Sequence, residues 1–294
     1  MNHSKFWSRI LAIIIVFVLI IPKEPIEGFD LAPEMDISFE DNVLQSTHQP
    51  SKTTPRPTET NKPAPTTPIP KPETKPSTES TPYEELIYSA DNSKFLIFLD
   101  AGHGWSDNGS SIKINEDGII DENGEYVMEK NITLDMTKKL KFALEKMGYT
   151  VGETRPGDSP NDCPVELING LFNAQRRPAY VNGQNADYFI SVHCNAFDSP
   201  SASGTRIFYS EKSALNYQLA TNMQAALSSQ MGNQATLHTG NLAITRESAM
   251  PTVLIETGFL TNQNDLNQLL DPAWQDQFVC AIAKGLDAQI HSGN

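Results

Sequence analysis

The chain has 294 residues and a formal net charge of −14 at pH 7, and residues 83–294 alone hold 14 Lys and Arg against 26 Asp and Glu. This acidic balance argues against nucleic acid as a partner, because contacts to the phosphate backbone need basic side chains. Three cysteines are too few for a disulfide scaffold, and we interpret them as small buried residues.

The N-terminal segment, residues 1–22, is typical of an exported protein. Lys5 and Arg9 flank its start, and an unbroken apolar run of 12 residues at 10–21 ends at Pro22. This pattern matches a signal peptide and is short for a membrane span of about 20 residues. Because no convincing small-residue cleavage site follows, an uncleaved transmembrane anchor is favoured slightly over a cleaved signal peptide.

Residues 23–82 are predicted to form a disordered linker. From position 45 onward this tract consists almost entirely of Pro, Thr, Ser, Lys and Glu, so it cannot bury enough apolar surface to fold. Its prolines favour an extended polyproline II conformation with a reach on the order of 100 Å. The tract is either a spacer through a cell wall or a plain tether.

The remainder, residues 83–294, is predicted to be one α/β domain. Short apolar runs predict strands at 94–100, 149–155, 187–192, 204–210 and 251–256. Helices are predicted at 131–148, 165–182 with a kink or break at Pro178, 213–230 and 273–289. Alternating strands and helices predict a three-layer sandwich, in which a mostly parallel or mixed sheet has helices on both faces.

Polar side chains follow three of the predicted strands. His103 comes after the first strand, His193 after the third and Glu256 after the last, while Glu129 directly precedes the first long helix. In open α/β sheets the carboxyl ends of the strands form the binding edge. Each residue alone has a structural explanation, such as a hydrogen-bonded core histidine or a carboxylate at a helix start. Together they predict a shared site.

The residue types at this edge predict a catalytic zinc site. Two imidazoles and a carboxylate occupy three corners of a zinc tetrahedron and leave the fourth for water or substrate. A further carboxylate can then transfer protons. We therefore predict His103, Glu129 and His193 as ligands of one zinc ion and Glu256 as the catalytic acid/base. Other carboxylates compete with Glu129 for the ligand role, namely Glu116, Asp117, Asp121, Glu122 and Glu125.

Five stretches carry a resemblance to a known family: "FLDAGHG", "EKNITLDMTKKL", "TRPGD", "ADYFISVHCNAF" and "PTVLIETGFLTNQND". They resemble successive motifs of the zinc-dependent N-acetylmuramoyl-L-alanine amidases of the amidase 3 type, over about residues 95–286. The resemblance implies a bacterial peptidoglycan hydrolase that cleaves the amide between N-acetylmuramic acid and L-alanine. It implies a location in the cell envelope, outside the cytoplasmic membrane, peptidoglycan as the polymeric substrate, and a possible activator protein as partner.

The family motifs match the predicted site. The histidine of "GHG" matches His103, the glutamate of "EK" matches Glu129, the histidine of "SVH" matches His193, and the glutamate of "ETGF" matches Glu256. Arg155 and Arg177 lie where the family often carries arginines, and we interpret them as structural or as supports of the site. The first motif departs from the commoner form, because alanine stands at position 101 where proline is usual.

Segment 106–128 is longer than in many members of the family and contains two turn signals, which predict a hairpin. This hairpin either forms the rim of the substrate groove or is an exposed acidic loop.

Two other functions of the whole chain remain as alternatives to the amidase. One is a zinc carboxypeptidase or peptidase that acts on the stem peptide, and the other is a non-catalytic wall-binding regulator with the same fold.

Overall fold

The computed structural model describes residues 81–159, 162–164 and 176–292. The predicted signal peptide or anchor at 1–22 lies outside the described residues, and so does the predicted linker at 23–82 except for its last two residues. The domain boundaries therefore stay predictions. Within the described part of the chain, no helix combines the length and the apolar character needed to cross a membrane.

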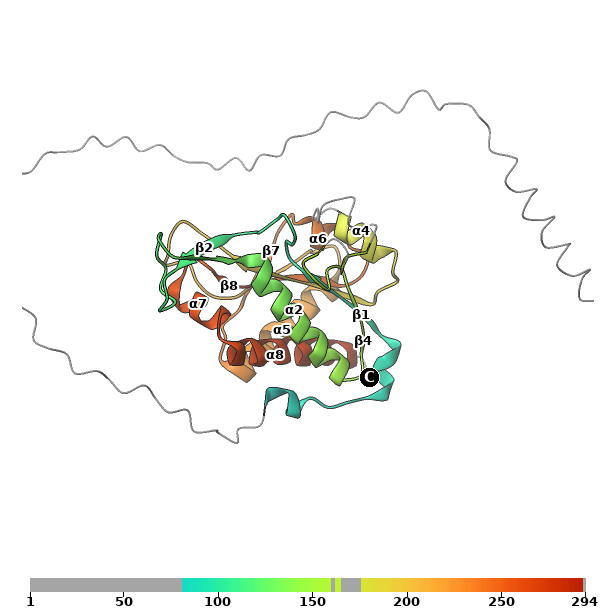
Figure 1. Ribbon diagram of the computed structural model, residues 1–294. Coiled ribbons are helices and arrows are strands. Elements are labelled where there is room, and N and C mark those ends of the chain that lie inside the picture. Colours follow the sequence, from blue (N-terminus) through green and yellow to red (C-terminus); the bar gives the residue numbers. More distant parts are fainter. Residues whose placement is uncertain (1–80, 160–161, 165–175, 293–294) are drawn as a thin grey trace, which may run out of the picture. The chain divides into compact units, whose positions relative to one another are not determined.

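A six-stranded sheet with the order β4-β1-β5-β8-β6-β7 forms the centre of the fold (Figure 1). Its strands are β1 (Leu96–Ala101), β4 (Thr150–Glu153), β5 (Tyr188–Asn195), β6 (Arg206–Tyr209), β7 (Thr236–Thr239) and β8 (Thr252–Phe259). The first four in spatial order are parallel, β6 is antiparallel to β8, and β7 is parallel to β6. The predicted mixed sheet is confirmed.

Helices cover both faces of the sheet, as Figure 1 shows. The larger core lies under α2 (Glu129–Lys146), α5 (Ala214–Met231) and α8 (Pro272–His291). On the opposite face, α4 (Arg176–Asn182) and α6 (Ala243–Glu247) cover a smaller core. The predicted three-layer sandwich is therefore confirmed.

Strand β5 shows how the sequence positions side chains at the sheet edge. Ile190 and Val192 belong to the larger core, whereas Phe189 belongs to the smaller one. Because side chains in a strand alternate between the two faces, His193 points to the same face as Phe189. The apolar pattern of the strand thus determines the direction of its polar end.

The predicted hairpin is present as β2 (Ser111–Ile114) and β3 (Glu125–Met128), which pair antiparallel. Its tip is held by Gln263, the first residue of α7 (Gln263–Leu269). The Ile120 N–H donates to Gln263 Oε1 over 2.9 Å, and Gln263 Nε2 donates to the Gly118 carbonyl over 2.9 Å. These bonds connect the hairpin to the segment that follows β8.

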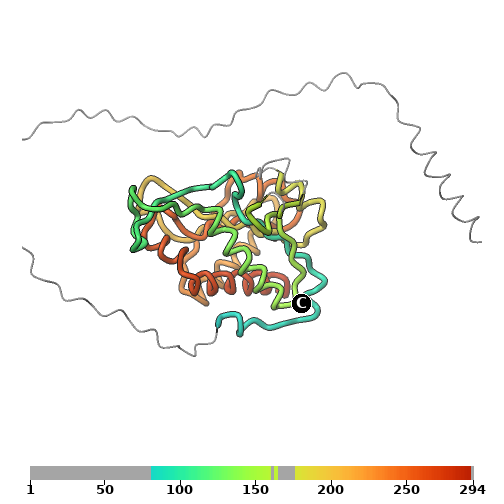
Figure 2. The backbone as a smooth tube through the Cα atoms, in the orientation of Figure 1, coloured from blue at the N-terminus to red at the C-terminus, as the bar shows by residue number. Residues whose placement is uncertain are grey.

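Residues before β1 belong to the same folded unit. They form two short 3-10 helices, η1 (Pro82–Glu85) and η2 (Ala90–Lys94). Leu86, between them, is buried in the larger core. The C-terminal end of α8 lies beside η2, where His291 Nε2 and Asn92 Oδ1 are 3.1 Å apart (Figure 2).

Differences from the sequence predictions are local. Helix α2 begins two residues earlier than predicted, so Glu129 is its first residue. Helix α4 continues through Pro178, so a break there is wrong, whereas the alternative of a kink stays a prediction. Residues 165–175 of that predicted helix lie outside the described residues. Strand β7 was not predicted because its sequence, TLHT, is polar and lacks a buried apolar face.

Candidate metal centre and active site

The loop after β1 holds His103 in an unusual backbone conformation. Its φ is 60°, in the left-handed region that residues other than glycine seldom adopt. Arg177 donates to the carbonyls of Ala101 and His103 over 2.7 Å each, and Arg155 donates to those of Ala101 and Gly102. Both arginines are buried and therefore act as structural supports of the loop, in agreement with the sequence interpretation.

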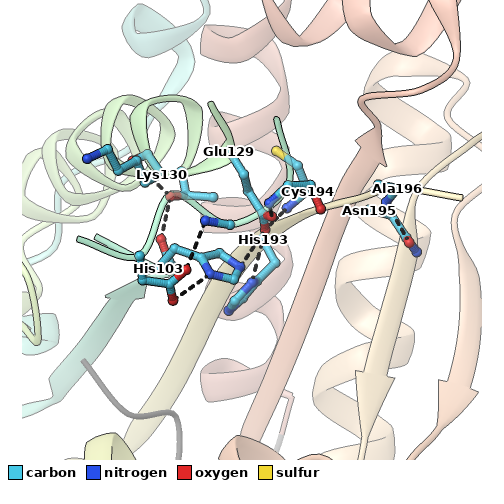
Figure 3. A network of polar contacts seen from close by, with 12 residues as sticks. His103, Glu129, Lys130, His193, Cys194, Asn195 and Ala196 are labelled. Carbon is cyan, nitrogen blue, oxygen red and sulfur yellow. Dashed lines mark hydrogen bonds and ion pairs between the residues drawn. The ribbon is translucent and has the colours of Figure 1, made fainter. Parts of the chain in front are cut away.

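Glu129 lies between the two histidines, as Figure 3 shows. Its Oε1 atom is 3.1 Å from His103 Nε2 and 3.1 Å from His193 Nδ1. Backbone N–H groups fix the carboxylate, since Cys194 donates to Oε1 and Ser110 donates to Oε2, each over 2.9 Å. The start of α2, the end of β5 and the loop after β1 thus meet at one carboxylate.

These three side chains, called the metal group below, could hold a metal ion. One ligand atom from each of His103, Glu129 and His193 lies within 4.8 Å of the others, and among the described residues no second group of this kind occurs. The hairpin carboxylates that the sequence offered as competing ligands do not belong to this group. Two imidazole nitrogens and one carboxylate oxygen are a donor set suited to zinc with an open fourth position.

Asp107 is a contributor that the sequence reasoning missed. Its Oδ2 is 2.9 Å from His103 Nδ1, while its Oδ1 accepts a hydrogen bond from the Gly109 N–H over 2.9 Å. A carboxylate on one imidazole nitrogen orients the other nitrogen toward a metal ion. The only signal in the sequence is the Asp-Asn-Gly turn that follows His103 by four residues.

Two glycines make room for the side chains of His103, Glu129 and His193. A Cβ atom at Gly102 would lie 2.4 Å from the His193 ring. At Gly109, where φ is +63°, a Cβ atom would lie 2.6 Å from both Glu129 Oε2 and the His103 ring. Larger residues would therefore displace the side chains, which indicates that the backbone is shaped around the group.

Charge at the centre favours a bound cation. Burial opposes ionisation of Glu129, but hydrogen bonds from both imidazoles outweigh burial and hold the pKa of this carboxyl well below its usual range. Burial likewise lowers the pKa of His103, but Glu129 and Asp107 outweigh it and raise that pKa overall. A carboxylate that stays ionised beside two imidazole nitrogens is suited to hold a metal ion, because ligands bind a metal in their deprotonated form.

Glu256 lies next to the group on β8. It is the register partner of His193 on the neighbouring strand, so both side chains point to the same face of the sheet. Its Oε2 atom is buried and has no hydrogen-bond partner among the described residues, and burial raises the pKa of the carboxyl. A buried oxygen without a partner is unfavourable, which is typical of a group that gains its partner from a bound water or substrate.

Residues 97–288 match the family model described as N-acetylmuramoyl-L-alanine amidase. The germination-specific N-acetylmuramoyl-L-alanine amidase of Bacillus subtilis (strain 168) is 29% identical over 198 residues, which cover 65% of this chain and 78% of that protein. The amidase LytC of the same organism is 29% identical over 192 residues, covering 64% of this chain. The match spans only 34% of the length of LytC.

Solved structures show the same fold. The CwlD amidase from Clostridioides difficile, in complex with the GerS lipoprotein, is 28% identical and has a TM-score of 0.56, with 68% of this chain and 100% of that chain covered. The catalytic domain of CwlV from Bacillus (Paenibacillus) polymyxa var. colistinus is 25% identical with a TM-score of 0.54, covering 67% and 98%. By its sequence match and its fold, the chain belongs to the N-acetylmuramoyl-L-alanine amidase family.

Proposed function

We propose that this chain is a zinc-dependent hydrolase of the amide bond between the lactyl group of N-acetylmuramic acid and L-alanine in bacterial peptidoglycan. One observation carries the proposal: His103, Glu129 and His193 converge beside Glu256, whose Oε2 is buried without a partner among the described residues. Metal ligands and a proton-transferring carboxylate thus lie at one sheet edge. Membership of the amidase family supports this bond as the target.

The residues present fit zinc. His103 Nε2, Glu129 Oε1 and His193 Nδ1 are the atoms that would hold the ion, and Asp107 would keep His103 in the tautomer that offers Nε2. When bound, zinc supplies a Lewis acid that polarises the scissile carbonyl and makes a water molecule more acidic.

Glu256 is proposed to transfer the proton. Its carboxylate accepts a proton from the attacking water and then donates it to the alanine nitrogen as the amide bond breaks. The buried position keeps bulk water away from Oε2, so the carboxyl meets only the reacting groups. General acid/base catalysis of this kind contributes roughly 10²- to 10⁴-fold to a rate.

We also propose that the catalytic domain acts outside the cytoplasmic membrane, in the cell envelope. The apolar segment 1–22 would export the chain and, if it is not cleaved, would anchor it to the membrane, and segment 23–82 would act as the linker. A regulatory partner is a further part of this proposal, motivated by the relative CwlD, which was solved in complex with the GerS lipoprotein.

Digestion of purified peptidoglycan by the full chain tests the proposal. The reaction is run with zinc, with a chelator, and with the variant Glu256→Gln, and the products are identified by mass spectrometry. Glu116→Gln serves as the matched control, because Glu116 is an exposed hairpin carboxylate outside the metal group. We expect the full chain and the control to release stem peptides with a free alanine amine.

The chelator and Glu256→Gln should each abolish this release. Shortened peptides that remain attached to muramic acid would instead identify a peptidase of the stem peptide. Tight binding to the wall without any product, under all zinc conditions, would identify a non-catalytic wall-binding protein.

A further inference from the structure

Arg206 lies beside the proposed acid/base. It is the first residue of β6, and its register partner on β8 is Glu256, which in turn is the partner of His193 on β5. Side chains directly opposite each other on neighbouring strands point to the same face and are separated by about 5 Å. His193, Glu256 and Arg206 therefore form a row across three strands on one face of the sheet.

The guanidinium of Arg206 points toward the carboxyl edge of β8. Its central carbon lies 4.7 Å from the centre of the Phe259 ring. Phe259 lies three residues after Glu256, at the end of β8, and is the register partner of Asn195 beyond a shift in register that follows His193. Stacking on this ring holds the guanidinium near the carboxyl end of β8, beyond the position of Glu256.

Within the described part of the chain this guanidinium makes no hydrogen bond and no ion pair, although its positive charge acts on Glu256 and works against the burial that raises the pKa of that carboxyl. Arg155 and Arg177, by contrast, donate to several backbone carbonyls. Acidic residues outnumber basic ones, 26 to 14, in residues 83–294, so an arginine that forms no ion pair is unexpected in this domain. Arg206 is also half-buried, and an arginine offers five N–H donors for an anion to occupy.

We propose that Arg206 binds a carboxylate of the stem peptide, on the residue that follows the alanine. The inference rests on the proposed amide hydrolysis, in which Glu256 donates a proton to the alanine nitrogen. The row runs from the metal group through Glu256 to Arg206, so Arg206 lies on the side of the departing peptide. One residue advances the peptide by about 3.8 Å, which brings the next side chain within reach of the guanidinium.

Arg206 would then determine specificity. A carboxylate matches the fork of N–H groups in a guanidinium and forms two parallel charge-assisted hydrogen bonds, whereas a carboxamide offers only one neutral acceptor. The chain should therefore prefer peptides with a free carboxyl group at this position over the amidated form.

The test compares two matched muropeptides, which carry either glutamate or glutamine after the alanine. The full chain with zinc, Arg206→Gln and Arg206→Lys are assayed for kcat and KM with each peptide. Arg246→Gln is the control, because Arg246 pairs with the exposed Glu247 on α6, outside the active site. We expect the full chain and the control to prefer the glutamate peptide about tenfold in kcat/KM.

Arg206→Gln should lose this preference, mainly through a higher KM for the glutamate peptide, and Arg206→Lys should retain part of it. An equal loss with both peptides would mean that Arg206 acts on Glu256 or on the fold, and would overturn the inference. Absence of any preference in the full chain would also overturn it.

Calorimetric binding of the two peptides separates this inference from the proposed function. If neither peptide is cleaved but the glutamate peptide binds more tightly, and Arg206→Gln abolishes that difference, then hydrolysis is refuted and the carboxylate site stands. If cleavage occurs without any difference in binding or turnover, the hydrolase stands and the carboxylate site is refuted.

Discussion

The orientation of the His103 side chain depends on residues from several parts of the chain. Arg177 donates to its carbonyl, and Asp107 contacts its Nδ1 atom, so both the backbone and the ring are fixed. The left-handed backbone of His103 is intrinsically unfavourable by roughly 1–2 kcal/mol, which these contacts offset. Polar residues outside the metal group are therefore expected to control metal affinity.

Replacing Asp107 with asparagine tests this expectation. Asparagine keeps the size of the side chain but removes the charge that orients the His103 ring and makes its other nitrogen more basic. We expect zinc affinity to fall about 10- to 100-fold, measured by competition with a chromophoric chelator. Asp117→Asn, in an exposed turn of the hairpin, should leave the affinity unchanged. An unchanged affinity in Asp107→Asn would refute the orienting role.

Gly109 offers a second test at the same scale. Alanine at this position would bring a Cβ atom to 2.6 Å from Glu129 Oε2, whereas at Gly118, where φ is +77°, no atom lies within 4 Å. Both substitutions place alanine in the left-handed region, so both should destabilise the fold by roughly 1 kcal/mol. Only Gly109→Ala should also lose zinc binding and amidase activity, measured by calorimetry and product release. Equal activities would contradict this.

Near the candidate metal centre, a buried polar cluster connects strands β1 and β5 and the residue after β4 to helix α4. Asp100 is fully buried and accepts hydrogen bonds from Arg177, Ser191 and Thr154. Burial opposes its charge, but the Arg177 guanidinium and these hydrogen bonds outweigh burial and hold the pKa of Asp100 below its ordinary value. The cluster thus fixes the end of β1, from which the loop with His103 extends.

This cluster predicts a pH dependence of stability. Because the pKa of Asp100 is lower in the folded than in the unfolded chain, its contribution is complete above the unfolded value of about 4 and is lost as pH falls through the folded value. Asp100→Asn should destabilise the fold by about 3–5 kcal/mol at pH 7, since it leaves Arg177 buried without its charged partner.

Denaturant unfolding between pH 7 and pH 3 measures this effect. The free energy of unfolding should fall less steeply with acid in Asp100→Asn than in the unmodified chain. Asp135→Asn, on the exposed face of α2, should follow the unmodified chain. Parallel curves for Asp100→Asn and the unmodified chain would contradict the depressed pKa.

At the scale of elements, the apolar runs in the sequence predict the buried strands but not how those strands pair. Strands β5 and β8 are buried on both faces, and their sequences therefore predict both the strands and the edge that carries His193 and Glu256. The antiparallel direction of β6 depends on pairing with a strand about 50 residues away, so no local pattern indicates that Arg206 lies opposite Glu256. Asp107 was missed because its contact arises from loop geometry, which has no sequence period.

In the molecule as a whole, the proposed zinc ligands come from three segments that are far apart in the sequence. His103 follows β1, Glu129 begins α2 and His193 lies near the end of β5, and these elements pack on the larger core. The unfolded chain cannot hold all three groups together, so an ion that they bind stabilises the folded state selectively. Metal affinity and stability are therefore coupled.

This coupling predicts the effect of metal removal. Zinc at about a thousand times its dissociation constant adds roughly 4 kcal/mol to the free energy of unfolding, which raises Tm by about 8–16 °C in a domain of this size. Scanning calorimetry of the full chain with zinc and with a chelator measures the difference. His193→Ala should abolish it, whereas His238→Ala, whose ring contacts Thr236 on β7, should preserve it. If His193→Ala kept the full shift, zinc would be stabilising the chain at a different place, and the His103, Glu129 and His193 group would not be the metal centre.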